Sequence, residues 1–560
     1  MTRLAPGAAT ELAAERPPSV LARSYRRLAT ANIGVAIAAF GVASAMAMMQ
    51  ALSRANLDLP FRSASVYYMS VTAHGTLMAL VFTTFFIMGL GYVVAGRALM
   101  ETLPLRRTAW VSFWVAVAGT VATVVAILAG KATVLYTFYP PLKAHPAFYI
   151  GLTLVVVGSW GWSLVMLYSL RLWRREHPGR LIPLAMYGYA ATVIVWLLAT
   201  VGVAAEMLLL LIPWSLGWTD KVDPVLARML FWWFGHPLVY FWLLPAYVIW
   251  YSMLPRAAGG RLFSDPLGRL VFAMFILLST PVGFHHQFMD PGIPSGWKLF
   301  HTFNTLLILF PSFITAFTIV ASLEIAGRMR GGTGVLGWTR TLPWGDPLVS
   351  SVILSMLLFA VGGFGGAINA SFGLNSVVHN TSWIPGHFHT TVGSATALTF
   401  MGASYVVVPQ LLGRRLELAP MARVQPWLWF FGMLLFSIPT HATGLLGMPR
   451  RVYDASYGDH PMAASWQWLT DVSAIGGLVL FASALFYLLV MLFTLRGAKT
   501  PQGELELAEP LEDPGTKGAV FDRLGTLTLV AAALIVVAYA YPIWHHLQMT
   551  RFGSPGFSPF

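Results

Sequence analysis

The sequence contains no cysteine among its 560 residues. This absence excludes disulfide bonds, iron–sulfur clusters, covalently attached c-type haem and a thiolate-bridged dicopper centre within this chain. A metal bound here must therefore be held by histidine, carboxylate, methionine or backbone groups. Of these, histidine is the residue that stands in suitable places.

Charge is also scarce: Asp, Glu, Lys and Arg make up 10% of the chain, whereas 57% of the residues are hydrophobic. A soluble domain carries charge on about a quarter of its residues, and so little charge suits a surface that faces lipid. The formal net charge of +13 does not indicate nucleic-acid binding, because Arg and Lys gather in short segments between apolar runs. We predict an integral membrane protein that binds no nucleic acid.

Long apolar runs fill most of the chain. A membrane-spanning helix needs roughly 20 mostly apolar residues, so the sequence predicts an all-α, polytopic membrane bundle of about 13 transmembrane helices. Their expected limits are 28–53, 69–96, 107–130, 147–171, 187–213, 225–253, 268–289, 300–326, 347–370, 382–412, 424–447, 463–495 and 521–545. We interpret 28–546 as one membrane domain between a cytoplasmic segment, 1–27, that lacks a removable signal peptide, and a tail, 547–560.

The loops predict the orientation of the bundle. Basic residues are concentrated in alternate loops, beginning before the first span at Arg26 and Arg27. The positive-inside rule therefore places the N-terminus in the cytoplasm and the C-terminus outside, and we expect a bacterial inner membrane. Arg450 and Arg451 are exceptions because they fall in an outer loop. The polar, acidic and Pro-containing segment 497–520 is expected to be a mobile cytoplasmic connector to the last span.

Six of the fourteen histidines lie inside predicted spans, where an ionisable side chain is costly and indicates a function. They occur in the segments TAHGTLMALVF, WWFGHPLVYFW, TPVGFHHQF and WIPGHFHTTVG, as His74, His236, His285, His286, His387 and His389. All six fall in the outer half of the bilayer, although they come from four different spans. Independent packing histidines have no reason to share a depth, so we interpret the six as metal ligands.

The spacing of these histidines restricts what they can bind together. His387 and His389 are about 200° apart around a helix, so they cannot share one metal and instead suit two centres that flank the helix. His285 and His286 are about 100° apart and could share a small ion only where the helix end is distorted. His236 and Tyr240 are four residues apart, so their rings can touch on one helix face.

The remaining histidines receive a different interpretation. A single histidine in a membrane helix is more often a hydrogen-bonded packing residue than a ligand, and most of the others lie in loops or near interfaces. This interpretation applies to His145, His177, His301, His441, His460, His545 and His546.

The segments HPLVYFW, GFHHQF and HNTSWIPGHFH resemble the signature segments of subunit I of the haem–copper oxidase superfamily. The similarity extends over nearly all spans and includes TVLYTFYPPLKAH, FWWFGHP, STPVGFHHQF and VPQLL. Within the superfamily the chain looks most like the B family, whose type member is a ba-type cytochrome c oxidase.

This resemblance implies two haems and one copper ion. His74 and His389 resemble the axial ligands of a low-spin haem, expected to be of b type. His387 resembles the single proximal ligand of a high-spin haem of a or b type, whose other face is open for dioxygen. The ligands of the facing copper would be His236, His285 and His286, and imidazole suits both metals.

The resemblance also assigns residues around the metals. Tyr240 resembles the tyrosine that is covalently joined to a copper ligand, where it would supply an electron and a proton for O–O bond cleavage. Arg450 and Arg451, in MPRRVY, resemble the pair that contacts haem propionates, which need charge-assisted partners. His379, in HNTSW, would lie near the propionates as well. Asn375 departs from the B-family type member, which has an acid there, so its proton-exit route is not carried over.

Hydroxyl groups in two spans predict a proton path from the inner face. Span eight offers Ser312, Thr315 and Thr318 on one helix face, and span six offers Tyr247 and Tyr251 below Tyr240. Together they resemble the single K-type pathway of the B family, although any one hydroxyl could simply bond its own helix backbone. Leu238 stands where the A family has a glutamate, and Thr315 stands where it has a lysine. Glu324 is a weaker candidate.

The function implied is that of the catalytic subunit of a proton-pumping terminal respiratory oxidase, of the cytochrome c oxidase type, which reduces dioxygen to water. Because the chain has no cysteine, cytochrome c would donate electrons through a separate subunit II that carries the dicopper centre; a quinol donor stays open. One alternative is a nitric oxide reductase of the same superfamily, which needs glutamates that spans six and seven lack. A secondary transporter, with repeats and broken helices around a midplane site, is the alternative from another class.

Overall fold

The computed structural model describes residues 21–57, 63–99, 102–500, 503, 505–550 and 553–558. The α-helices are α1 Arg23–Arg54, α2 Ala64–Thr76, α3 Thr83–Ala98, α4 Arg106–Leu128, α5 Pro146–Glu176, α6 Leu184–Glu206, α7 Ile212–Ser215, α8 Pro224–Ser252, α9 Leu254–Ala257, α10 Asp265–Leu278, α11 Ser295–Leu307, α12 Leu309–Met329, α13 Pro347–Ala370, α14 Phe372–Val378, α15 Trp383–Phe388, α16 Ala397–Leu412, α17 Ala419–Leu445, α18 Gln467–Arg496, α19 Gly515–Ala519 and α20 Leu524–Gln548. Short 3-10 or π turns are η1 Leu77–Phe82, η2 Met207–Leu211, η3 Gly283–Gln287, η4 Gly337–Thr341, η5 His389–Gly393 and η6 Pro461–Ser465. Two strands, β1 Lys221–Val222 and β2 Ser554–Pro555, pair antiparallel.

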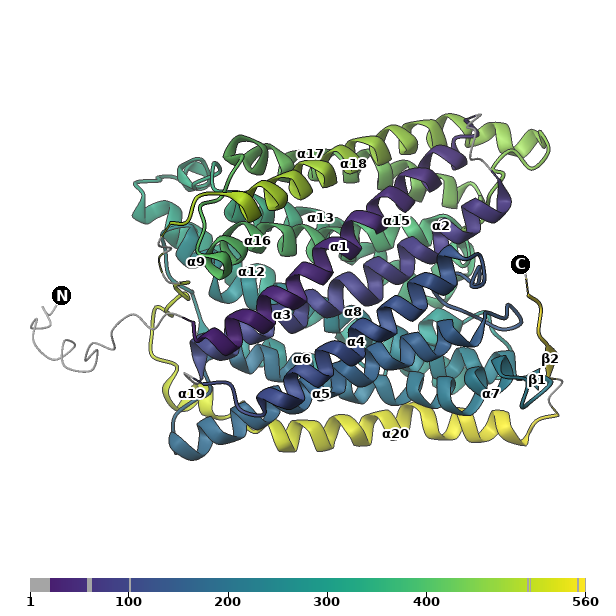
Figure 1. Ribbon diagram of the computed structural model, residues 1–560, viewed down its shortest axis with the longest axis horizontal. Coiled ribbons are helices and arrows are strands. Elements are labelled where there is room, and N and C mark those ends of the chain that lie inside the picture. The colour runs from purple at the N-terminus through teal and green to yellow at the C-terminus, as the bar shows by residue number, and fades with distance from the viewer. Residues whose placement is uncertain are drawn as a thin grey trace, which may run out of the picture.

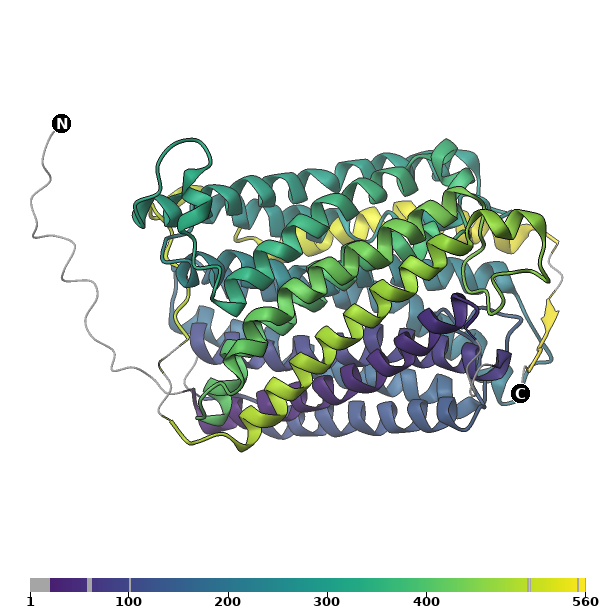
Figure 2. The ribbon, with the colours of Figure 1, turned by 90° about the horizontal axis from the view of Figure 1, so that it is seen from above.

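Helices long and apolar enough to cross a membrane number 12 within the described part of the chain. They lie side by side along the horizontal axis of Figure 1, and Figure 2 shows the same arrangement from above. The prediction of an all-α polytopic membrane bundle is confirmed. The chain is therefore an integral membrane protein.

The seventh predicted span, 268–289, is not a continuous membrane helix, so the described part of the chain has 12 long apolar helices where the sequence predicted about 13. Its helical part, α10, has 14 residues and ends at Leu278. Pro281 follows three residues later; proline lacks an N–H and disfavours helix in the residue before it. The chain then continues through the 3-10 turn η3. The described chain consequently begins and ends at opposite ends of the bundle, with α1 starting at the left and β2 at the right of Figure 1.

Small residues allow neighbouring helices to approach closely. A Cβ added at Gly151 of α5 would lie 2.7 Å from the Gly119 carbonyl oxygen of α4, and one at Gly158 would lie 2.6 Å from the Ser112 carbonyl oxygen. Membrane helices associate through such small-residue contacts because lipid provides no hydrophobic drive between them.

The connector between α18 and α20 is bound to the adjacent ends of other helices, contrary to the expectation that it moves freely. The Ala508 N–H donates to the Ser252 carbonyl at 2.6 Å, and the Leu262 N–H donates to the Glu509 carbonyl at 2.9 Å. Ion pairs join Arg256 to Glu506 and Arg261 to Glu509 in the same region. The part of 497–520 that the structure describes is therefore docked.

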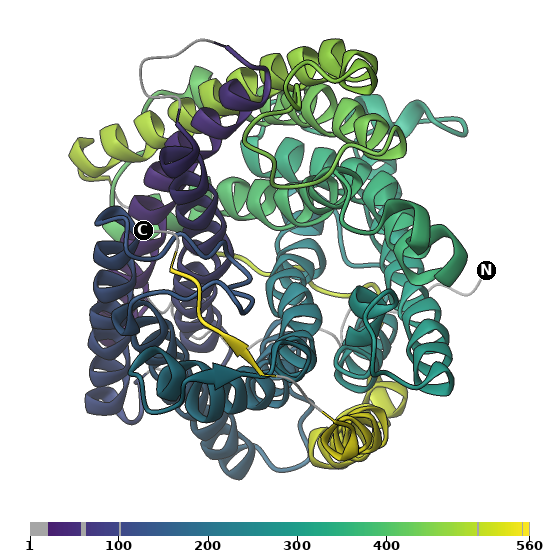
Figure 3. The same cartoon turned by 90° about the vertical axis from the view of Figure 1, so that its right-hand side faces the viewer.

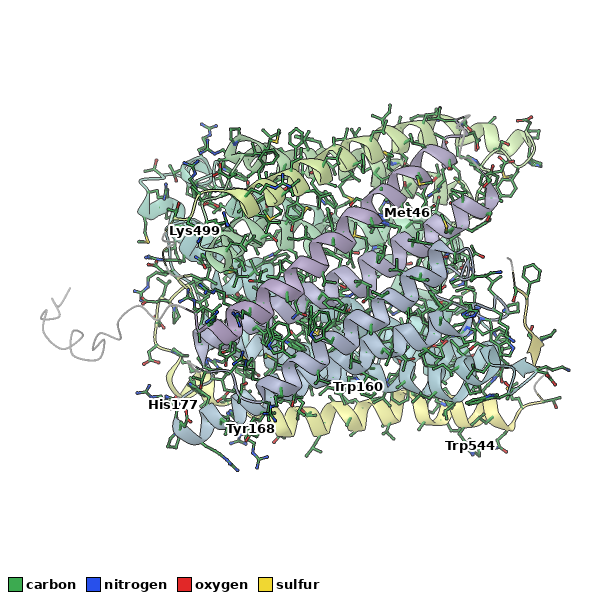
Figure 4. All side chains as sticks on the ribbon, viewed as in Figure 1. Met46, Trp160, Tyr168, His177, Lys499 and Trp544 are labelled. Atoms are coloured by element: carbon green, nitrogen blue, oxygen red, sulfur yellow. The ribbon has the colours of Figure 1, made fainter. Side chains whose placement is uncertain are left out.

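Helix α20 lies at the edge of the bundle, where Figure 3 shows it end-on in yellow. It packs against α8, α10 and α11. Most of its length faces outward: Leu529 is 73% exposed and Trp544 is 56% exposed, and Figure 4 shows Trp544 projecting away from the bundle. Its buried side chains include Ala538 and Tyr539.

Candidate active site

Three of the predicted ligands form a compact cluster. His236 comes from the middle of α8, and His285 and His286 come from η3. One ring nitrogen of each lies within 4.8 Å of those of the other two, and His236 Nδ1 is 3.0 Å from His286 Nε2. Metal–imidazole bonds are about 2 Å long, so this separation suits two ligands of one ion. The cluster could therefore hold one metal ion through three imidazoles, and imidazole suits copper.

The broken seventh span makes this convergence possible. Adjacent residues on a regular helix point about 100° apart, but η3 is a 3-10 turn at which the helix has already ended. The rings of His285 and His286 lie 4.2 Å apart between centroids, and the His236 ring lies 4.4 Å from His285. The sequence indicated that His285 and His286 could share an ion only at a distorted helix end, and the structure has such an end here.

The hydrogen bond made by one ring nitrogen of a histidine determines whether the other ring nitrogen can face the metal. Thr305 Oγ1 donates to the His301 carbonyl at 2.6 Å and lies 3.0 Å from His285 Nδ1. Because a hydroxyl has one proton to donate, Thr305 accepts from the Nδ1–H of His285, and Nε2 is left free. His286 stacks on Trp232, with 3.7 Å between ring centroids.

Tyr240 contacts the opposite nitrogen of His236. Its hydroxyl oxygen lies 3.0 Å from His236 Nε2, one helical turn further along α8. His236 therefore turns Nδ1 toward the cluster and Nε2 toward the phenol. The sequence had placed these two residues on one helix face, and the structure brings them together.

His74 and His389 face each other across a cavity. Their rings are nearly parallel, at 7°, with 6.1 Å between centroids. Two metal–nitrogen bonds of about 2 Å account for most of this separation, and the ring radii account for the rest. Each Nδ1 lies within hydrogen-bond distance of a backbone carbonyl, that of Ala43 at 3.0 Å and that of Pro385 at 2.7 Å. Bonds of this kind orient metal-ligating histidines, and the pair fits an iron bound between two imidazoles.

The large cavity at this pair has a volume of about 220 Å³ and a basic end. Apolar and aromatic side chains such as Phe82 and Trp429 form much of its wall, and Arg450 and Arg451 lie in its lining with Tyr136. These properties suit a flat, apolar macrocycle with anionic side chains.

The arginines lack anionic partners within the described residues. Nε and Nη2 of Arg451 are buried and make no hydrogen bond in this part of the chain, and its guanidinium lies 4.9 Å above the Tyr136 ring. Burial and the neighbouring Arg451 charge lower the pKa of Arg450 to about 10. Burial raises the pKa of Tyr136, but the charges of Arg451 and Arg450 outweigh it, so the pKa is lowered. The site favours carboxylates such as haem propionates.

His387 lies on the other side of its helix from His389. The large cavity is lined by His389 and, among the described residues, not by His387. A Cβ added at Gly365 of α13 would be 2.6 Å from His387 Nδ1, so only a glycine permits this approach. Nδ1 of His387 is buried and makes no well-formed hydrogen bond among the described residues. A buried imidazole in such surroundings fits a role as a single haem ligand.

His379 and Asn375 border this region. His379 lies at the C-terminal end of α14, and burial together with the Arg450 charge lowers its pKa. The amide of Asn375 donates to the His285 carbonyl at 3.3 Å and to the Asn369 carbonyl at 2.8 Å. Asn375 therefore contacts the backbone of a cluster histidine, which the sequence did not reveal.

The predicted proton path is partly connected. The Tyr247 hydroxyl donates to Ser312 Oγ, and the Tyr251 hydroxyl donates to Thr315 Oγ1, each at 3.1 Å. Thr318 donates to the carbonyl of Ile314 at 2.7 Å, the backbone bond that any helical hydroxyl can make. Glu324 forms an ion pair with Arg328 at 2.6 Å on the same helix.

Comparisons with known proteins decide the family. The family described as cytochrome c and quinol oxidase polypeptide I matches residues 27–479. The chain belongs to this family. It is similar to cytochrome c oxidase subunit 1 of Thermus thermophilus, with 45% identity over 519 residues, covering 89% of this chain and 91% of that protein. It is also similar to the subunit 1 of Synechocystis sp., with 26% identity over 483 residues and 80% of each chain covered.

A solved structure has the same fold as this family member. A chain of a haem–copper terminal oxidase dimer, determined by cryo-electron microscopy, superposes with a TM-score of 0.90 at 35% identity, covering 96% of both chains. The protein is thus the subunit I of a haem–copper oxidase, an oxidoreductase of the cytochrome c oxidase type that acts on dioxygen.

Several residues around the site carried no usable signal in the sequence. Thr305 is an ordinary hydroxyl on a membrane helix, and His301 resembled a packing histidine. Arg54 lines the large cavity although it lies at the end of α1, far from any motif. Thr305, His301 and Arg54 come near the predicted ligands only through the three-dimensional fold.

Proposed function

We propose that this chain is the catalytic subunit of a B-family, proton-pumping terminal oxidase that reduces dioxygen to water. A low-spin haem of b type would be held by His74 and His389, and a high-spin haem of a or b type by His387. One copper ion would be held by His236, His285 and His286. Bound haems and copper supply electron transfer and dioxygen reduction.

The contact between His236 and Tyr240 carries the proposal. A phenol 3.0 Å from the outer nitrogen of a cluster histidine is placed to give up a proton beside the metals. A nitric oxide reductase of the same superfamily lacks this tyrosine. The apolar Leu238 occupies the adjoining turn in place of an acid.

The hydroxyl chain gives Tyr240 a source of protons. Tyr247 and Tyr251 lie on α8 below Tyr240, and each donates to a hydroxyl of α12. Hydroxyl groups hold water and protons in a membrane without the cost of a buried charge. We assign Ser312, Thr315 and Thr318 to this path, with its entrance at the cytoplasmic end.

Electrons would arrive from the opposite end. Cytochrome c is the expected donor through a separate subunit II, which carries the dicopper centre that a chain without cysteine cannot hold. The similarity to proteins named cytochrome c oxidase subunit 1 supports this donor. Arg450, Arg451 and His379 would hold the propionates near the docking face, with the N-terminus in the cytoplasm of a bacterial inner membrane.

A visible difference spectrum and a metal analysis of the purified protein test the proposal. We expect reduced-minus-oxidised bands of two haems and about one copper per two haem irons. Non-haem iron in place of copper would indicate a nitric oxide reductase, and a colourless protein would overturn the assignment. If the enzyme oxidised quinol and did not oxidise cytochrome c, the proposed electron donor would be wrong and the rest of the proposal would stand.

The proton path is tested by Thr315→Val. Loss of this hydroxyl removes the acceptor of the Tyr251 proton, so oxygen turnover should fall on the order of tenfold, since water can partly replace a lost hydroxyl. Thr302→Val on the same span is the matched control, because Thr302 bonds only to the Lys298 carbonyl of its own helix among the described residues. Equal turnover in both variants would remove Thr315 from the path.

A further inference from the structure

The break in the seventh span leaves backbone groups that a helix would have paired. In a continuous helix the N–H groups of Gly283 and Phe284 would donate to the carbonyls four residues earlier, those of Ser279 and Thr280. Since the helix ends at Leu278, these bonds are missing just before His285. Unpaired backbone groups are costly inside a membrane, so the chain must satisfy them elsewhere.

Tyr539 of α20 bonds two of these groups with one hydroxyl, although the Thr280 carbonyl also accepts from the Val282 N–H at 2.8 Å. The Gly283 N–H donates to Tyr539 Oη at 3.1 Å, and Oη donates to the Thr280 carbonyl at 2.9 Å. The side chain is fully buried, at 0% exposure. A Cβ at position 283 would lie 2.5 Å from this oxygen and 2.2 Å from the Trp232 carbonyl oxygen. Glycine is therefore required for the contact.

His301 satisfies the third group and links it to the same helix. The Phe284 N–H donates to His301 Nδ1 at 3.2 Å, so Nδ1 is unprotonated and the proton is on Nε2. Nε2 lies 3.3 Å from the Ala538 carbonyl oxygen of α20 and donates to it. That carbonyl is free because the residue four positions later is Pro542, which has no N–H.

Aromatic packing fixes the same contact. The Tyr539 ring stacks on Trp233 of α8 at 5.0 Å between centroids and at 18°, and it meets Phe284 edge-on at 4.9 Å. Trp233 lies three residues before His236, and Phe284 lies directly before His285. Helix α20 therefore touches both segments that carry the histidine cluster.

We infer that Tyr539 of α20, together with His301, is a positioning residue that holds the η3 turn in the geometry required for copper binding. The inference rests on the proposed copper role of His285 and His286. The family match ends at residue 479, before α20 begins, so the inference assigns a function to a helix outside the matched range. Residues that orient metal ligands affect affinity by about 10–100-fold when they are replaced.

The test compares Tyr539→Phe with Tyr541→Phe in the purified holoenzyme. Tyr541 lies on the same helix, is 43% exposed and stacks on Trp297. Copper content per haem is measured after dialysis against graded concentrations of a copper chelator. We expect Tyr539→Phe to lose half its copper at a chelator concentration about 10–100-fold lower than the wild type does, and Tyr541→Phe to match the wild type.

A spectroscopic readout separates positioning from general loss of stability. After photolysis, carbon monoxide on copper gives an infrared band that reports the ligand geometry, and we expect it to shift or split in Tyr539→Phe while the low-spin haem spectrum stays unchanged. Wild-type chelator dependence together with a wild-type band in Tyr539→Phe would overturn the inference. A wild-type protein without copper would instead overturn the proposed function.

Variants of His301 keep the test decisive if Tyr539→Phe fails to accumulate. His301→Asn retains an acceptor oxygen near the Nδ1 position, whereas His301→Phe retains only the ring. We expect His301→Asn to keep copper at higher chelator concentrations than His301→Phe does. Equal chelator dependence of the two variants would show that the Phe284 N–H needs no acceptor, which would contradict the inference.

Discussion

At the level of single residues, the availability of a ring nitrogen to a metal depends on the bond made by the other nitrogen. His74, His389 and His285 each direct Nδ1 at a carbonyl or hydroxyl oxygen, so each leaves Nε2 for a metal. His236 is reversed, because Tyr240 lies at its Nε2. These orientations exist in the protein itself, so a metal would meet ligands that are already turned toward it.

His387→Ala tests the assignment of two haems to opposite sides of one helix. We expect the high-spin haem signal to be lost and low-spin absorption to remain at least in part, because His389 and His74 meet in a separate cavity. Visible and magnetic circular dichroism spectra of the purified variant measure both signals. Simultaneous and complete loss of the two signals would argue that the haem sites are not independent.

Tyr240→Phe tests the proton donor. The ring stays and the hydroxyl is removed, so both haem spectra should persist while oxygen turnover falls by about 10²–10⁴-fold, the range of a positioned proton donor. Oxygen consumption with a chemical reductant measures the change. Turnover at the wild-type rate would make the role given to Tyr240 wrong.

At the level of elements, four of the six predicted ligands lie at or near interruptions of helices. His389 begins the π turn η5, His74 lies three residues before the π turn η1, and the adjacent pair lies in η3. Such turns change which residues share a helix face, and π turns are frequent at functional sites. The interruptions aim side chains that a regular helix would direct elsewhere.

The close packing of α4 and α5 predicts that a larger side chain between them lowers the stability of the protein. Gly151→Leu places a side chain against the Gly119 carbonyl oxygen and the Thr123 hydroxyl, so we expect a loss of about 1–3 kcal/mol of stability from overpacking. Gly34→Leu on α1 is the control, because no atom of another described element lies within 4 Å of a Cβ there. Thermal unfolding in detergent, followed by circular dichroism, compares the two. Equal midpoints would contradict the packing argument.

At the level of the whole molecule, the sequence predicted the membrane bundle, the family and the groups of histidines. It could do so because spans and ligands leave local patterns: long apolar runs and motifs with flanking residues. The end of α10 was missed because the apolar run continues through Pro281, so hydropathy indicates a span where the backbone has no helix. Thr305 and Tyr539 were missed because their partners are remote in sequence. The docking of the described part of 497–520 depends on specific ion pairs that composition does not reveal.

The orientation of the whole chain is testable with tags at its two ends. Twelve long apolar helical segments and one crossing that is broken after Leu278 place the first and last described residues at opposite ends of the bundle. We expect protease added to intact spheroplasts to remove a C-terminal tag and to spare an N-terminal tag. Cleavage of both, or protection of both, would mean that the seventh segment does not cross; the reverse pattern would invert the predicted orientation.

The bonds from Tyr539 to Thr280 and Gly283 have a consequence for biogenesis. A ribosome makes the chain from its N-terminus, at about 5–20 residues per second, so the segment with His285 enters the bilayer well before its partner on α20 exists. During that interval its polar backbone groups lack these acceptors and donors in lipid, where water is scarce. Metal insertion would therefore be among the last steps of assembly, after translation has ended.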